Sequence, residues 1–319
     1  MPIVPTFQKA KRQQAKASIV IEGLSGSGKS GAALMLAHGL TQTWDTVAAV
    51  DTESNSLQLY VDVTLSSGVR LGSEQLAIGN IGADDGYKPS HFQLFRNAAI
   101  SQGYKALIID SMSHMWQYSG GILDIVNKLS KSSNNNNKYA IWGDPSVTAE
   151  KAAIMDLIRH PKLHCINTVR TKEKMETVTE DGKTKVKSLG EQQIMMPDFK
   201  YEPDLILKME KAGKPDGTPP KVTVLKSRYG IFVVDEEYEL TANLIEQLRS
   251  YLEEGTSPEE LIEQQRLEYV EALTKYLDEN ANARSLLKPI KEQLNIAPDV
   301  KLKDMSLKEL KGIFSSVVI

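Results

Sequence analysis

The sequence reads Gly23-Leu24-Ser25-Gly26-Ser27-Gly28-Lys29-Ser30 near its amino terminus. This is the phosphate-loop pattern of a glycine, four further residues and then Gly-Lys-Ser. Residues 18–21 before it form a short β-branched run, and residues 31–37 after it favour a helix. A strand, a glycine-rich loop and a helix are the context that this motif requires, so the pattern predicts a phosphate-binding loop.

The glycines allow the loop backbone to form a concave nest whose N–H groups point at phosphate oxygens, with the positive end of the next helix behind them. We expect Lys29 to reach the terminal phosphates of ATP and the Ser30 hydroxyl to bind Mg²⁺. The predicted nucleotide-binding residues are Gly23, Ser25, Gly26, Ser27, Gly28, Lys29, Ser30 and Gly31.

Composition predicts a soluble globular protein, since 41% of the 319 residues are hydrophobic and the net charge is −3. That balance argues against wholesale coating by nucleic acid and leaves room for a local basic strip. Cys165 is the single cysteine, which excludes an intramolecular disulfide and fits the cytoplasm. No apolar run approaches the roughly 18 residues of a membrane span, so we expect no membrane association.

Short apolar runs alternate with longer helical patterns from residue 18 onward, which predicts an α/β fold with a mostly parallel sheet flanked by helices. The predicted strands are residues 18–22, 47–50, 76–78, 106–109, 165–169, 205–207, 221–225 and 231–234. The predicted helices are residues 29–41, 89–103, 120–130 and 146–160. Residues 130–138 are predicted to be a polar loop, and residues 212–220 a turn-rich link.

Three regions are predicted along the chain: a basic flexible arm at residues 1–17, a core at 18–250 and a helical region at 256–319. The helical region opens on a capping box, because Ser257 is followed by Pro258 and by Glu260 three residues later. Further helices are predicted at residues 281–294 and 306–315, and no motif in this region indicates chemistry.

Two acidic residues are candidates for the chemistry of ATP hydrolysis. Asp110 ends the apolar run 106–109, where a carboxylate can organise Mg²⁺ at the carboxyl end of a parallel strand. Glu53 follows the run 47–50 at the same edge and could polarise the attacking water, although a plain exposed loop glutamate remains an alternative.

A phosphate loop, then a strand ending Asp51-Thr52-Glu53, then a strand ending Asp110-Ser111 resembles the RecA-type ATPase core. The resemblance covers roughly residues 18–235 and implies that Glu53 activates water. The run Lys226-Ser227-Arg228-Tyr229-Gly230 resembles the basic box of RadA and of DnaB-type helicases. It implies that Lys226 and Arg228 reach the ATP of a neighbouring subunit in a ring or filament.

The order of these motifs, with a long excursion over residues 171–199 and Tyr201-Glu202-Pro203-Asp204 before a strand, looks like phage-encoded RecA-like ATPases. Some of those act in single-strand annealing. The resemblance implies a DNA-stimulated ATPase that acts on single-stranded DNA in recombination or annealing, in the host cytoplasm. Its implied partners are further copies of the chain and a single-strand binding protein or another replication or recombination protein.

The excursion contains the turn pair Asp181-Gly182 in a Thr/Val/Lys-rich run, which indicates a hairpin. By position, residues 170–200 and 116–144 would correspond to the two DNA-contacting loops of RecA-like filaments. The candidate DNA-binding residues are Arg170, Lys172, Lys174, Lys183, Lys185 and Lys187. Nearby aromatic residues fit core packing as well as they fit base stacking.

One position departs from the RecA pattern. RecA has Asn-Gln at the end of the strand before its second DNA loop, and this chain has Asn167-Thr168. The family's glutamine senses the γ-phosphate, so here the signal would run through Asn167 or Arg170, or would be weak.

Other functions remain open. A hexameric DnaB-type helicase or loader would use the same core, and a KaiC-like regulatory ATPase would bind a protein in place of DNA. A small-molecule phosphotransferase would need an arginine-rich lid that the sequence does not show. No set of His and Cys residues completes a zinc site, so Mg²⁺ is the metal we expect.

Overall fold

A computed structural model describes residues 10–64, 70–132, 138–180, 183–214 and 218–317. The chain divides into two compact units. The core unit is Ala15–Leu252, and the tail unit is Glu253–Ile319 with the amino-terminal segment up to Gln14. Within the described residues, no helix combines the length and the apolar character needed to cross a membrane.

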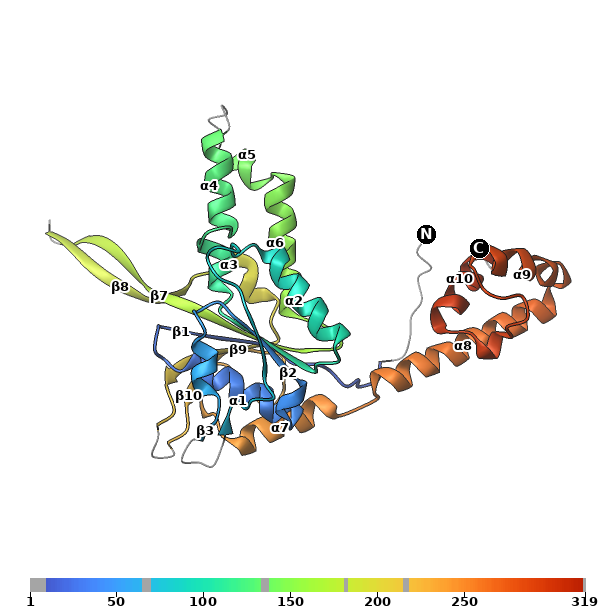
Figure 1. Ribbon diagram of the computed structural model, residues 1–319, viewed down its shortest axis with the longest axis horizontal. Helices are drawn as coiled ribbons and strands as arrows, with labels where there is room; N and C mark the ends of the chain where they lie inside the picture. Colours follow the sequence, from blue (N-terminus) through green and yellow to red (C-terminus); the bar gives the residue numbers. More distant parts are fainter. Residues whose placement is uncertain (1–9, 65–69, 133–137, 181–182, 215–217, 318–319) are drawn as a thin grey trace. The chain divides into compact units, whose positions relative to one another are not determined.

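A mixed sheet forms the middle of the core unit (Figure 1). Its parallel strands lie in the order β9 (Leu205–Lys211), β1 (Ser18–Gly23), β7 (His164–Glu180), β6 (Ala106–Asp110), β2 (Val47–Asp51) and β5 (Ala77–Asn80). Beyond β9, β10 (Lys221–Ser227) and β11 (Glu237–Glu239) continue the sheet antiparallel. The predicted α/β fold with a mostly parallel sheet is confirmed.

Helices cover both faces of this sheet because its strands are apolar on both sides. On β1, Ile19 and Ile21 face α1 (Lys29–Thr41) and α7 (Ala242–Glu253), whereas Val20 faces the opposite layer. The opposite layer consists of α2 (Pro89–Ser101), α3 (Ser113–Gln117), α4 (Ile122–Ser132) and α6 (Pro145–Ile158). The two layers bury the core and leave the strand ends accessible for a site.

The predicted excursion over residues 171–199 contains a long hairpin. β7 continues past the sheet and pairs antiparallel with β8 (Lys183–Gln193), from Thr171 opposite Gln193 to Glu180 opposite Lys183. The predicted turn at residues 181–182 lies outside the described residues. Figure 1 shows this hairpin extending away from the helical layers of the core unit.

Some predicted elements are wrong. Residues 231–234 are not a strand, because the chain turns there and Asp235 adopts a left-handed φ of 68° before β11 begins. The loop predicted at residues 130–138 starts too early, since α4 continues to Ser132, and it ends too late, since α5 (Lys138–Trp142) begins at Lys138; residues 133–137 lie outside the described residues. Two further helices, α3 and α7, were not predicted from the sequence.

The tail unit is helical. It contains α8 (Pro258–Glu279), α9 (Ala281–Gln293) and α10 (Leu307–Val317), which bury Leu273, Leu310 and Ile313 between them. The predicted capping box at Ser257 and Glu260 is present at the start of α8. The remaining short elements are η1 (Trp44–Thr46), η2 (Ser56–Tyr60), β3 (Val63–Thr64), β4 (Arg70–Leu71), η3 (Pro197–Tyr201) and η4 (Leu302–Asp304).

Candidate active site

The phosphate loop links the end of β1 to the start of α1. Gly26 and Gly28 have left-handed φ values of 78° and 94°, which side chains with a Cβ rarely adopt. A Cβ at Gly28 would also lie 2.8 Å from the Cβ of Ala212. No side chain caps α1, so the N–H groups of its first turn are free to face an anion.

Lys29 is buried beneath this loop, with 7% of its surface exposed. Its Nζ donates to the carbonyl oxygens of Gly23 at 3.0 Å and Leu24 at 2.7 Å. Burial lowers the pKa of Lys29, and the carboxylates of Asp110 and Glu53 oppose that effect. A cation in low dielectric with only carbonyl partners is a strong attractor for a phosphate group.

Asp110 lies at the carboxyl end of β6 and is 1% exposed. Its Oδ1 accepts a hydrogen bond from the Thr168 hydroxyl, while Oδ2 has no partner of normal geometry among the described residues. Burial raises the pKa of Asp110, and the nearby hydroxyls of Ser30 and Thr168 oppose the rise. A divalent cation beside Oδ2 would relieve this burial cost, so the Ser30 hydroxyl and Asp110 fit a Mg²⁺ that also binds phosphate.

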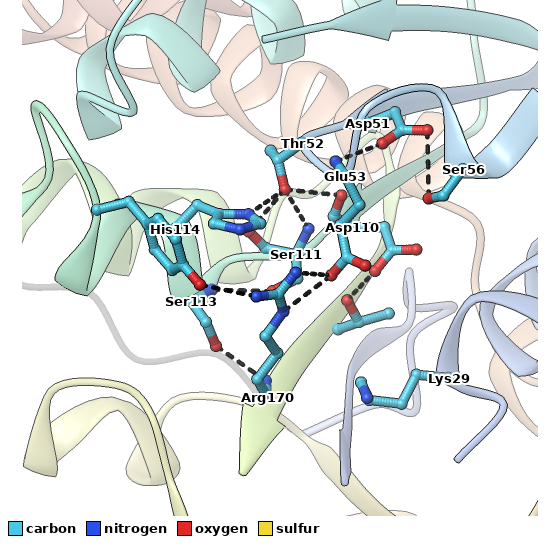
Figure 2. Close-up of polar contacts among 12 residues, drawn as sticks. Lys29, Asp51, Thr52, Glu53, Ser56, Asp110, Ser111, Ser113, His114 and Arg170 are labelled. Carbon is cyan, nitrogen blue, oxygen red and sulfur yellow. Dashed lines mark hydrogen bonds and ion pairs between the residues drawn. The ribbon is translucent and has the colours of Figure 1, made fainter. Parts of the chain in front are cut away.

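Glu53 is held in the site by a turn after β2. The buried carboxylate of Asp51 accepts hydrogen bonds from the backbone N–H of Glu53 at 2.6 Å and of Leu57 at 2.7 Å. The backbone N–H of Thr52 donates to the Asp110 carbonyl at 2.8 Å, so this turn is fastened to β6. The Glu53 side chain, 29% exposed, therefore faces the same space as Asp110 and Lys29 (Figure 2).

Arg170 belongs to this site, and not to the projecting part of the hairpin where the DNA-binding candidates were expected. Its Nη2 and Nε contact Glu53 Oε1 at 2.7 and 3.0 Å. Its Nη1 donates to the Tyr118 hydroxyl at 2.9 Å, and its backbone N–H donates to Ser113 Oγ at 2.8 Å. These contacts fix the guanidinium beside the Glu53 carboxylate (Figure 2).

A buried histidine supports the same corner. His114 contacts the Thr52 hydroxyl and stacks on the Tyr87 ring at 4.8 Å between centroids. Burial, together with the charge of Arg170, lowers the pKa of His114 to about 4. His114 is therefore neutral near pH 7 and adds no second cation next to Arg170.

One pocket of about 490 Å³, a size that suits a nucleotide, is lined by residues of the phosphate loop together with Glu53, Asp110 and Arg170. Beyond the phosphate loop, its walls include Leu59, Tyr60 and Val63, which the sequence reading missed. No motif marks these three residues in the sequence. Their place six to ten residues after Glu53 is the one signal that the sequence offers. Tyr60 and Leu59 offer apolar surface on which the nucleoside part of a ligand can lie.

Lys226 and Arg228 lie elsewhere. β10 runs antiparallel to β9, so Ser227 pairs with Leu205 at the amino end of the parallel strands. The phosphate loop follows Gly23 at the opposite end of β1. The five steps from Ser18 to Gly23 separate the two ends by about 17 Å at roughly 3.3 Å per step, so this basic pair does not contact the pocket of its own chain.

The other DNA-binding candidates lie on the hairpin. Lys172 and Lys174 are exposed on β7. β8 includes Lys183, Lys185 and Lys187, for which the structure describes the backbone and not the side chains. In the second expected DNA-contacting segment, residues 116–144, the Trp116 ring stacks on the Trp142 ring at 6.0 Å between centroids. This contact fits the packing role that the sequence left open beside base stacking.

Asn167 does not reach the pocket. It is 1% exposed on β7 between Val20 and Ile109, in the apolar layer opposite α1. Neither atom of its amide has a hydrogen-bond partner among the described residues. Of the two residues proposed to carry the phosphate signal, Arg170 is the one that lines the pocket.

In a comparison with known protein families, residues 15–232 match a family model described as an AAA domain. The matched segment is more than half of the chain and includes the phosphate loop, Glu53, Asp110 and Arg170. None of the curated proteins compared with the chain matches it.

We expect Asn167→Leu to stabilise the core unit. The substitution replaces an unpaired buried amide with an apolar side chain of similar volume, and should raise the free energy of unfolding by about 1–3 kcal/mol. Urea denaturation of the parent and the variant measures this difference. A loss of stability would show that the amide is satisfied in solution.

We expect Arg170→Gln to lower kcat for ATP hydrolysis by about 10- to 100-fold, because Glu53 loses the contact that orients it. Nucleotide affinity should change little, since Lys29 and the loop amides remain. The matched control is Lys172→Gln, which changes the next basic residue on β7. Equal kcat values for the parent and Arg170→Gln would remove Arg170 from the reaction.

Proposed function

The chain belongs to the AAA-domain family of P-loop ATPases, and we propose that it is a RecA-like member that hydrolyses ATP and acts on single-stranded DNA in recombination or strand annealing. One observation carries the proposal: the phosphate loop, Asp110, Glu53 and Arg170 meet in a single pocket. The resemblance of the motif order to RecA-type cores supplies the choice of DNA as partner.

Each group has a distinct task in hydrolysis. The loop amides and Lys29 bind the β- and γ-phosphates, and Ser30 and Asp110 would hold Mg²⁺, which would neutralise phosphate charge. Glu53 accepts a proton from the water whose oxygen attacks the γ-phosphorus, and the bond to the β-phosphate oxygen breaks to release ADP. Arg170 orients the Glu53 carboxylate for this step.

The hairpin provides a physical connection between DNA and this reaction. Its β7 leg starts at Arg170, which contacts Glu53. Its β8 leg ends at Gln193, whose amide contacts the buried carboxylate of Glu22, the residue directly before the first glycine of the phosphate loop. A ligand that moves the hairpin therefore acts on both sides of the bound triphosphate.

We expect the protein to bind Mg-ATP and Lys29→Ala to lose this binding, as measured by titration calorimetry. Glu53→Gln should bind ATP with unchanged affinity and hydrolyse it about 10²- to 10⁴-fold more slowly, because it cannot accept the proton. Glu74→Gln, at an exposed position outside the pocket, is the control. Retained turnover in Glu53→Gln would assign another base.

We expect single-stranded DNA to increase the ATPase rate and to be retarded in a gel-shift assay with ATP. Lys172→Ala and Lys174→Ala should weaken binding and reduce its salt dependence, because each lost phosphate contact lowers the log–log slope by about 0.7. Lys275→Ala in the tail unit is the control. ATP hydrolysis with neither stimulation nor a shift would favour the KaiC-like switch.

A further inference from the structure

A basic cluster formed by Arg159, Lys226 and Arg228 lies at the amino end of the parallel strands. Arg159 Nη2 and Arg228 Nη1 both contact Asp204 Oδ1, at 2.5 and 3.0 Å. Arg159 Nη2 also donates to the Glu202 carbonyl at 2.9 Å, and Lys226 Nζ donates to the Tyr201 carbonyl at 2.6 Å. Arg159 comes from the segment after α6, so another part of the chain joins Lys226 on β10 and Arg228 directly after it.

The three cations of this cluster outnumber the two carboxylates that act on it, Asp204 and Glu202. Among the described residues, Asp204 is the one carboxylate in direct contact with both guanidinium groups, and its side chain is 14% exposed. Burial and the neighbouring charge of Arg228 lower the pKa of Lys226, and the carboxylates of Asp204 and Glu202 oppose that effect. The side chains of Arg159 and Arg228 remain 48% and 50% exposed, so their other N–H groups can bind an anion.

The nucleotide pocket, in contrast, has too few cations for a bound triphosphate. Its lining residues include two cations, Lys29 and Arg170, and two carboxylates, Glu53 and Asp110, and Arg170 is already paired with Glu53. Mg-ATP adds two negative charges, and further charge develops in the transition state. The described lining residues of one chain therefore leave the triphosphate with too few cations.

The surroundings of both sites suit contact between copies of this chain. Leu59 and Val63 at the pocket are 79% and 40% exposed, and Tyr201 and Leu225 beside the basic cluster are 61% and 37% exposed. Exposed apolar side chains around a charged centre are typical of surfaces that another protein covers. Because the two sites lie at opposite ends of β1, such a contact is head-to-tail and can build a ring or a filament.

We propose that Arg159 is a third cation, with Lys226 and Arg228, that contacts the triphosphate bound by a second copy of the chain. The inference rests on the proposed ATPase function and extends it to a residue outside the basic box of residues 226–230. Asp204 holds the two guanidinium groups side by side. The arrangement suits two phosphate oxygens better than either arginine alone would.

Single variants give the first test. Arg159→Ala should lower kcat at least about tenfold, like Arg228→Ala, while the affinity of the dilute subunit for Mg-ATP stays unchanged, because the cluster is remote from its own pocket. Arg159→Lys keeps the charge and should restore part of the rate, and it also covers the case in which Arg159→Ala fails to fold. Lys162→Ala, an exposed lysine three residues further along the chain, is the control and should keep the parent rate.

Mixing two inactive variants is the decisive test. Glu53→Gln retains ATP binding and an intact basic cluster, whereas Arg159→Ala retains an intact pocket. In a random 1:1 mixture, half of the pockets are intact and half of those face an intact cluster, so about one quarter of the parent rate should return. Glu53→Gln mixed with the double variant Glu53→Gln/Arg159→Ala should stay inactive.

The possible failures are distinguishable. Full activity of Arg159→Ala, or an inactive mixture from an active parent, would overturn the contact across copies. Loss of DNA binding by Arg159→Ala with an unchanged DNA-independent rate would also overturn it and would assign the cluster to DNA phosphates. An inactive parent would instead contradict the proposed ATPase function.

Discussion

The alignment of parallel strands is the constraint on which the site depends. Hydrogen bonding sets Asp51 of β2 opposite Asp110 of β6, and Gly23 of β1 opposite Arg170 of β7. Four chain segments that are far apart in sequence therefore end at one edge, with the phosphate loop among them. A shift of one residue in any of these pairings would turn a functional side chain to the wrong face of the sheet.

Burial makes this alignment chemically useful. Asp110 and Lys29 are almost fully enclosed, so their opposite charges act in a medium of low dielectric. Burial raises the pKa of the acid and lowers that of the base, so each charged form is destabilised until a ligand compensates it. Mg²⁺ and a triphosphate together supply both missing charges.

Much of this arrangement was predictable, because glycine spacing and apolar runs report local structure directly. The phosphate loop, its flanking strand and helix, and the positions of Asp110 and Glu53 at strand ends follow from short-range pattern. The contact between Arg170 and Glu53 could not be predicted in this way. β7 runs from the sheet into the hairpin without a break, so the sequence pattern does not show which of its residues still line the pocket. α7 was missed although Ile245, Leu248 and Leu252 recur at helical spacing, and Arg159 has no local signal because its partner Asp204 is 45 residues away.

The first strand of the core, β1, contacts other parts of the chain at both of its ends. At its start, the backbone N–H of Ser18 donates to the Tyr229 hydroxyl at 3.1 Å, and Tyr229 directly follows Arg228. Near its end, Glu22 contacts the base of the hairpin. Because a strand is stiff along its length, β1 can transmit a displacement from one of its ends to the other. A displacement imposed by an adjoining molecule at one end would be delivered to the nucleotide at the other. If the proposed contact between copies forms, thermodynamic reciprocity requires that the nucleotide state also alters the affinity of one copy for the next.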